Sequence, residues 1–121
     1  MPDTEKIVII ATHGPDDPER ATLPFVVANA ALAMDVAATV VLQGASVVLA
    51  QQGVSDHVFA AGLPPLGTLL ASFFEQGGQL LVCTPCIKER KLEDHLIPKG
   101  ELIAAARVVQ ESLEAKAVLC Y

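Results

Sequence analysis

Apolar residues along the chain fall into short continuous runs rather than into alternating patterns. Three of these runs, rich in β-branched and aliphatic residues, span residues 6–11, 38–42 and 79–83. A continuous run of this length predicts a strand that is buried on both faces, as in a parallel sheet. Two further runs, at residues 101–104 and 116–121, predict a fourth and a fifth strand.

The segments between these runs predict helices. The clearest one carries apolar residues at positions i, i+3, i+4, i+7 and i+8 and ends at a pair of glycines. These apolar residues are Leu66, Leu69, Leu70, Phe73 and Phe74. Shorter helices are expected at residues 47–52, after Cys83, and at residues 105–114.

The helix after the first strand is expected to have Thr22 as its N-cap and Pro24 in its first turn, and to end at about Asp35. Its residues are apolar almost all round the helix. We therefore expect one face to pack on the sheet and the opposite face to contact another subunit.

The alternation of strands and helices determines the predicted fold class. Parallel strands joined by helical connections favour right-handed crossovers, with helices on both faces of the sheet. The sequence predicts a three-layer α/β/α fold with a five-stranded parallel sheet, in a single domain of residues 1–121.

Composition narrows the classes of function. The chain is 52% hydrophobic and only 18% charged, with a net charge of −6, which excludes disorder and makes binding to nucleic acid or to anionic membranes unfavourable. The longest uncharged stretch, residues 36–55, is interrupted by glutamines and glycines and does not predict a membrane span. Three cysteines without the pattern of an export signal indicate a cytoplasmic protein with free thiols.

Candidate chemistry is concentrated at the end of the third predicted strand. Cys83 ends this strand, and Cys86 follows within the first turn of the next helix. An ordinary thiol, with a pKa of about 8.5, is only about 3% ionised at pH 7, so a reactive cysteine needs positive surroundings. The N-terminus of the helix after Thr84 and the side chains of Lys88, Arg90 and Lys91 are expected to supply them.

Other interpretations of these cysteines stay open. Cys83 could be a small buried apolar residue, and Cys86 could be its redox partner. A Cys-x-x-Cys pair also occurs in thioredoxins, but here it lies too late in the order of elements for that fold. A zinc site needs about four ligands and only two cysteines are paired, so we expect no metal and no cofactor. His13 is a candidate neighbour of the site, and Cys120 is expected in the core.

Three segments resemble the DsrE/DsrF/TusD sulfur-relay family: the loop at residues 12–21, the strand at residues 39–44, and the strand, cysteine and basic helix at residues 80–93. The resemblance implies small α/β subunits that form homo- or hetero-oligomers, commonly trimers or hexamers. It also implies a persulfide on the cysteine that ends the third strand, which is Cys83 here. Cys86 lies outside the minimal pattern of the family.

Together these observations predict a cytoplasmic sulfur carrier or sulfurtransferase. Cys83 would hold sulfane sulfur as a persulfide, with Cys86 as a conditional resolving residue and His13, Thr84 and Lys88 as neighbours of the site. Its partners would be donor and acceptor proteins or low-molecular-weight persulfides, and the chain would form a homo-oligomer (trimer or hexamer). The alternatives are a non-catalytic assembly subunit and a dithiol redox protein.

Overall fold

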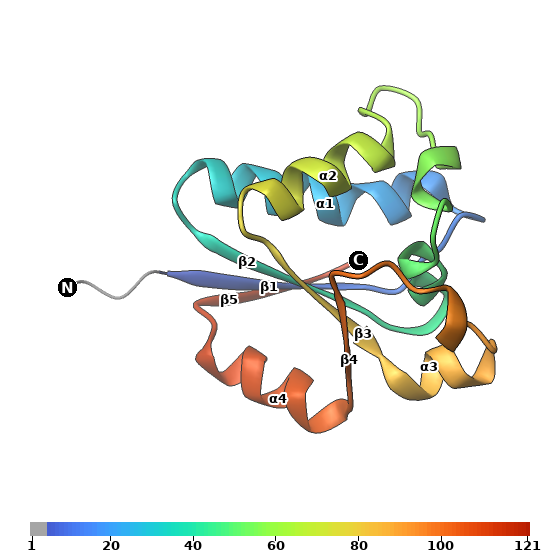
Figure 1. The fold of residues 1–121 in the computed structure, drawn as a ribbon. Coiled ribbons are helices and arrows are strands. Elements are labelled where there is room, and N and C mark those ends of the chain that lie inside the picture. Colours follow the sequence, from blue (N-terminus) through green and yellow to red (C-terminus); the bar gives the residue numbers. More distant parts are fainter. Residues whose placement is uncertain (1–4) are drawn as a thin grey trace.

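A five-stranded parallel sheet forms the centre of the molecule (Figure 1). The computed structural model describes residues 5–121. The strands are β1 (Lys6–Ala11), β2 (Ala37–Leu42), β3 (Gln79–Cys83), β4 (Gly100–Ile103) and β5 (Ala117–Cys120). They lie in the order β4-β3-β2-β1-β5, and every neighbouring pair is parallel.

Helices cover both faces of the sheet. They are α1 (Pro18–Ala33), α2 (Leu66–Glu75), α3 (Thr84–Glu89) and α4 (Ala105–Glu114), with short 3-10 helices η1 (Gly44–Ala50), η2 (Ser55–His57) and η3 (Glu93–His95). Helices α1 and α2 lie on one face and α4 on the other (Figure 1). The chain crosses the sheet in one direction from β1 to β4 and in the other from β4 to β5, so right-handed connections place α4 on the opposite face. The predicted three-layer fold is confirmed.

Two cores correspond to the two faces. The larger lies beneath α1 and α2, where Phe25 and Phe73 meet edge to face with ring centroids 5.5 Å apart. The smaller lies beneath α4 and contains Val8, Val41 and Leu81. Each of the three central strands contributes to both cores, which explains why their sequences are apolar without alternation.

The start of the first helix differs from the prediction. Helix α1 begins at Pro18, because Asp17 caps it by accepting a hydrogen bond from the backbone N–H of Arg20 at 3.2 Å. Thr22 is buried within the helix and Pro24 lies in its interior. The helix ends at Ala33, since the chain soon turns through Asp35 at φ 61°.

One expectation about surfaces is also corrected. Cys120 is exposed rather than in the core, because β5 is an edge strand. The large exposed apolar side chains lie mainly on other elements than α1, and they include Val109 and Leu113 on α4 and Val118 and Leu119 on β5. Within residues 5–121, none of the helices has the length and apolar character that crossing a membrane requires.

Candidate functional site

The two cysteines of the third strand lie side by side. Cys83 is the last residue of β3 and the N-cap of α3, Thr84 and Pro85 form the first positions of that helix, and Cys86 follows. Residues three apart at the start of a helix project to the same side, and the two Sγ atoms are 2.7 Å apart. Both cysteines are free thiols and both are half-buried.

The loop after β2 completes this arrangement. Because β2 lies next to β3, its carboxyl end brings Gly44 to the cysteines, and the Gly44 N–H donates a hydrogen bond to the Sγ of Cys86 at 3.3 Å. Gly44 has φ +58°, a conformation that side chains disfavour. The role of this glycine was not predicted, although the strand that ends in Gln43 and Gly44 was part of the family resemblance.

The surroundings of the two thiols shift their pKa values in opposite directions. Burial raises the pKa of Cys83, and its hydrogen bond with Cys86 raises it further. Burial also raises the pKa of Cys86, but the hydrogen bonds from Cys83 and Gly44 and the charge of Arg90 outweigh burial, so the pKa of Cys86 is lowered. Of the two thiols, Cys86 is therefore the stronger acid and Cys83 the weaker. The lowered pKa that was expected at Cys83 thus belongs to Cys86 instead.

The cation at the site is Arg90. Its guanidinium donates to the carbonyl oxygen of Cys86 at 3.2 Å, because Arg90 lies four residues further along the helical turn and ends α3. Its charge lowers the pKa of both cysteines. Lys88, which was expected beside the cysteines, is exposed on the last turn of α3 and does not contribute to either shift.

A small cavity of about 80 Å³ adjoins Cys83. Its walls come from β3, from the loop after β2 and from the junction of β4 with α4, namely Gln43, Cys83, Pro85, Ile103, Ala104, Ala105 and Val108. Ala104 is the N-cap of α4 and provides no side-chain cap, and Ala104 and Ala105 at the start of this helix border the cavity. Since a water molecule takes up about 30 Å³, the cavity has room for an additional sulfur atom on Cys83.

His13 and Thr84 also lie at the carboxyl edge of the sheet. Thr84 is the first residue of α3 and is half-buried. The His13 ring pairs with the hydroxyl of Thr12 (Nδ1 to Oγ1, 3.3 Å) rather than with a sulfur. Its loop packs closely against the next one, since a Cβ on Gly14 would lie 2.6 Å from the carbonyl oxygen of Ala45. The structure thus places His13 at the same edge of the sheet as the thiols but two strands away from β3, and its ring pairs with Thr12.

Metal ligands do not gather around the cysteines. Among residues 5–121, histidine, cysteine, aspartate and glutamate side chains form no group of three or more that could hold a metal ion. Cys83 and Cys86 alone supply two of the roughly four ligands of a structural zinc site.

Comparisons with known proteins identify the family and the fold of this chain. The model of the DsrE/DsrF-like family matches residues 5–121. The solved structure of the YchN protein from E. coli has a TM-score of 0.82 at 21% identity and covers 98% of this chain and 100% of YchN. BT1422 from Bacteroides thetaiotaomicron has a TM-score of 0.70 at 16% identity, with 97% and 95% coverage. MJ0760 from Methanocaldococcus jannaschii is 29% identical over 84% of this chain, which spans only 37% of that relative.

Proposed function

Because the chain belongs to the DsrE/DsrF-like family, we propose that it is a sulfur carrier that holds sulfane sulfur on Cys83. Family membership points to sulfur relay as the general class of function. The observation that supports the finer proposal is the pair of free thiols, 2.7 Å apart, with a cavity beside one of them. Cys83 lines that cavity, whereas the sulfur of Cys86 accepts a hydrogen bond from the Gly44 N–H.

Loading is a thiol–persulfide exchange. The sulfur of Cys83 attacks the outer sulfur of a donor R–S–SH, and Cys86, once ionised, takes the proton from Cys83. The donor's S–S bond breaks, the proton passes to the leaving R–S⁻, and the products are Cys83–S–SH and R–SH. The start of α4 borders the cavity that receives the outer sulfur, and the positive end of this helix favours its negative charge.

Delivery follows from the same exchange in reverse. A thiolate of the acceptor attacks the outer sulfur, which leaves Cys83 as a thiolate and the acceptor as a persulfide. When no acceptor is present, Cys86 attacks the inner sulfur and releases HS⁻ with formation of a Cys83–Cys86 disulfide. A dithiol reductant of the thioredoxin class must then supply two electrons to restore the thiols.

Mass spectrometry of the intact protein after exposure to inorganic polysulfide tests this proposal. We expect a mass increase of one or more sulfur atoms that Cys83→Ser abolishes. Cys86→Ser should retain loading at a reduced rate, because the base for Cys83 is lost. The exposed Cys120 provides the matched control, and Cys120→Ser should load like the unmodified protein. Loading that survives Cys83→Ser would show that the proposal is wrong.

Exposed apolar residues support a second part of the proposal, a homo-oligomer such as a trimer or hexamer. On α4, Val109 and Leu113 are 58% and 82% exposed. The edge strand β5 exposes Val118 and Leu119 as well. This surface, rather than the outer face of α1, is the candidate contact between subunits, and it would also serve a non-catalytic assembly subunit. An inert Cys83 in the polysulfide experiment would favour that alternative.

The short distance between the sulfurs favours a dithiol redox protein as the other alternative. Such a protein would exchange disulfides with a partner without carrying sulfane sulfur. The two activities differ in one product, because only the carrier gains the mass of sulfur after polysulfide treatment followed by gel filtration. A disulfide that forms with no mass gain at any donor concentration would favour the redox protein.

A further inference from the structure

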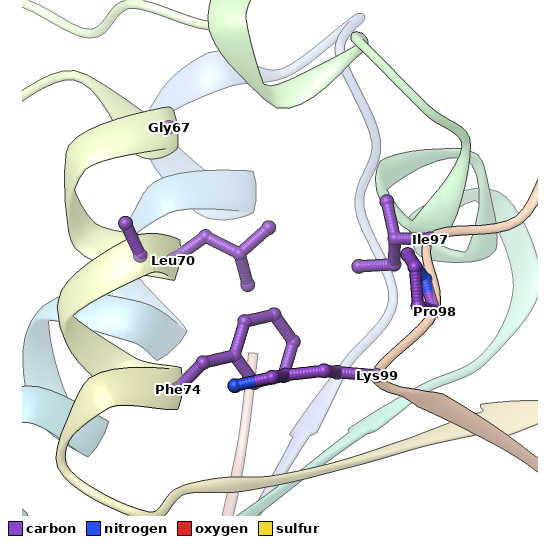
Figure 2. Close-up of a pocket in the computed structure, with 7 residues that line it drawn as sticks. Gly67, Leu70, Phe74, Ile97, Pro98 and Lys99 are labelled. Atoms are coloured by element: carbon purple, nitrogen blue, oxygen red, sulfur yellow. The ribbon is translucent and has the colours of Figure 1, made fainter.

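A larger hollow lies away from the cysteines, between α2 and the segment that leads into β4 (Figure 2). Its volume is about 350 Å³, within the range of about 300 to 1,000 Å³ that is typical of small-molecule sites. The lining residues are Gly67, Leu70, Ala71 and Phe74 from α2, and Ile97, Pro98 and Lys99 from the facing segment. The hollow is on the α2 side of the sheet, whereas the Cys83 cavity is bordered by α4.

The sequence of α2 explains why this space is open. Leu66, Leu70 and Phe73 are buried toward the sheet and fill the core. The neighbouring side of the helix carries two small residues that line the hollow, Ala71 and Gly67, and a Cβ on Gly67 would meet Asp56 rather than fill the space. The hollow is therefore walled by side chains that are apolar except at Lys99.

Lys99 places a positive charge at the rim of this hollow. Its Nζ lies over the ring of Phe74, 5.5 Å from the ring centroid, and Figure 2 shows both side chains at the same end of the space. Among residues 5–121, the ion pairs involve other lysines and arginines. Glu101 lines the adjoining polar hollow with Lys99, but its carboxylate is bound by Arg107 at 2.8 Å. The ammonium group of Lys99 is thus available to an anionic ligand, although the net charge of the protein is −6.

We propose that this hollow binds a small amphiphilic anion, a straight-chain carboxylate of medium length. Its alkyl chain lies against Leu70, Phe74 and Ile97, and its carboxylate meets the ammonium of Lys99. The charge at only one end of an otherwise apolar space favours this ligand over a neutral one. This site is independent of the proposed sulfur chemistry.

Isothermal titration calorimetry with octanoate tests the site on the full chain. We expect saturable binding of one molecule with a dissociation constant of about 0.1 to 1 mM, from the usual affinity per ligand atom. Lys99→Glu should weaken octanoate binding about tenfold and should strengthen binding of octylammonium, because the charge at the rim is reversed. Ala71→Trp, at an exposed position of α2, should fill the hollow and abolish binding of both ligands.

Lys116→Glu is the matched control, because it makes the same charge change next to β5, at the opposite edge of the sheet from β4. It should leave octanoate binding within about twofold of the unmodified protein. Cys83→Ser should also bind octanoate normally, so failure of the sulfur proposal and failure of this one are distinguishable. The proposal is overturned if Lys99→Glu behaves like Lys116→Glu, if octanol binds as tightly as octanoate, or if Ala71→Trp changes the oligomeric mass instead of the binding.

Discussion

Replacing Glu111 with glutamine perturbs the ion pairs that attach α4 to the sheet. Glu111 is only 6% exposed, and its oxygens accept hydrogen bonds from Lys6 Nζ at 2.6 Å and Arg107 Nε at 2.7 Å. Lys6 is on β1 and Arg107 is one turn earlier on α4. Because the first residues of α4 form a wall of the Cys83 cavity, this network also contributes to the position of that wall.

The expected loss of stability follows from the hydrogen bonds of Glu111 that glutamine keeps and those that it loses. A hydrogen bond to a charged group contributes about 1.5 to 3 kcal/mol when it is shielded from water. The Lys6 side chain is 21% exposed, so water can partly replace its lost partner. The amide of glutamine also keeps one acceptor oxygen. We therefore expect Glu111→Gln to lower the free energy of unfolding by about 1 to 2 kcal/mol at pH 7, a shift of about 0.5 to 1 M in the urea midpoint.

The pH dependence gives a second measurement. Burial raises the pKa of Glu111, but the hydrogen bonds from Lys6 and Arg107 and their charges outweigh burial, so the pKa is lowered overall. A lowered pKa stabilises the folded state above the unfolded value of about 4.3, and this contribution is lost as the pH falls toward the folded value. The difference between Glu111→Gln and the unmodified protein should thus be constant from pH 7 to about pH 5 and shrink below about pH 4.

Urea unfolding followed by circular dichroism at several pH values is the assay. Glu114→Gln is the matched control, because Glu114 is more than half exposed and lies 3.7 Å from the same lysine. Its midpoint should be unchanged. The reasoning is refuted if both variants unfold at the same urea concentration, or if the effect of Glu111→Gln grows as the pH falls.

Three further predictions concern the core, the thiols and the subunit contact. Gly78→Ala should lower the free energy of unfolding by about 1 to 3 kcal/mol, since a Cβ there would overlap the buried ring of Phe73; an unchanged midpoint in thermal or urea unfolding would contradict this. Iodoacetamide at low conversion should label Cys86 before Cys83 between pH 6 and about pH 8, as judged by peptide mass, because the pKa of Cys86 is lowered and that of Cys83 raised; the reverse order would contradict the assignment. Leu113→Glu should lower the mass measured by light scattering at micromolar concentration, and an unchanged oligomer would exclude α4 from the contact.

Much of the fold could be predicted because it depends on local patterns. The continuous apolar runs correspond to strands buried on both faces, and the five-residue stripe from Leu66 to Phe74 corresponds to α2. The predicted start of α1 was wrong because two helix-start signals compete in this segment. Asp17 followed by Pro18 forms the cap, whereas Thr22 and Pro24 fit the same rule but lie inside the helix.

The exposure of Cys120 and two contacts at the candidate site could not be predicted, because they depend on which strands become neighbours. Cys120 was expected in the core because its strand is apolar, but the strand order leaves β5 at an edge. The contact of Gly44 with Cys86 joins residues 42 positions apart through the pairing of β2 with β3. The start of α4 reaches the Cys83 cavity only because the chain crosses back over the sheet. Neither contact has a signal in the local sequence.

The spacing of Cys83 and Cys86 has a consequence for capturing the partners of this protein. Two thiols held at 2.7 Å react as if each were at a very high effective concentration around the other. Any mixed disulfide that a partner forms with Cys83 is therefore attacked by Cys86 and released before it can be isolated. A chain with Cys86→Ser lacks this second thiol. If Cys83 carries sulfur as proposed, a partner thiolate that attacks the inner sulfur of the persulfide and releases HS⁻ would stay bound to Cys83 as a mixed disulfide under non-reducing conditions.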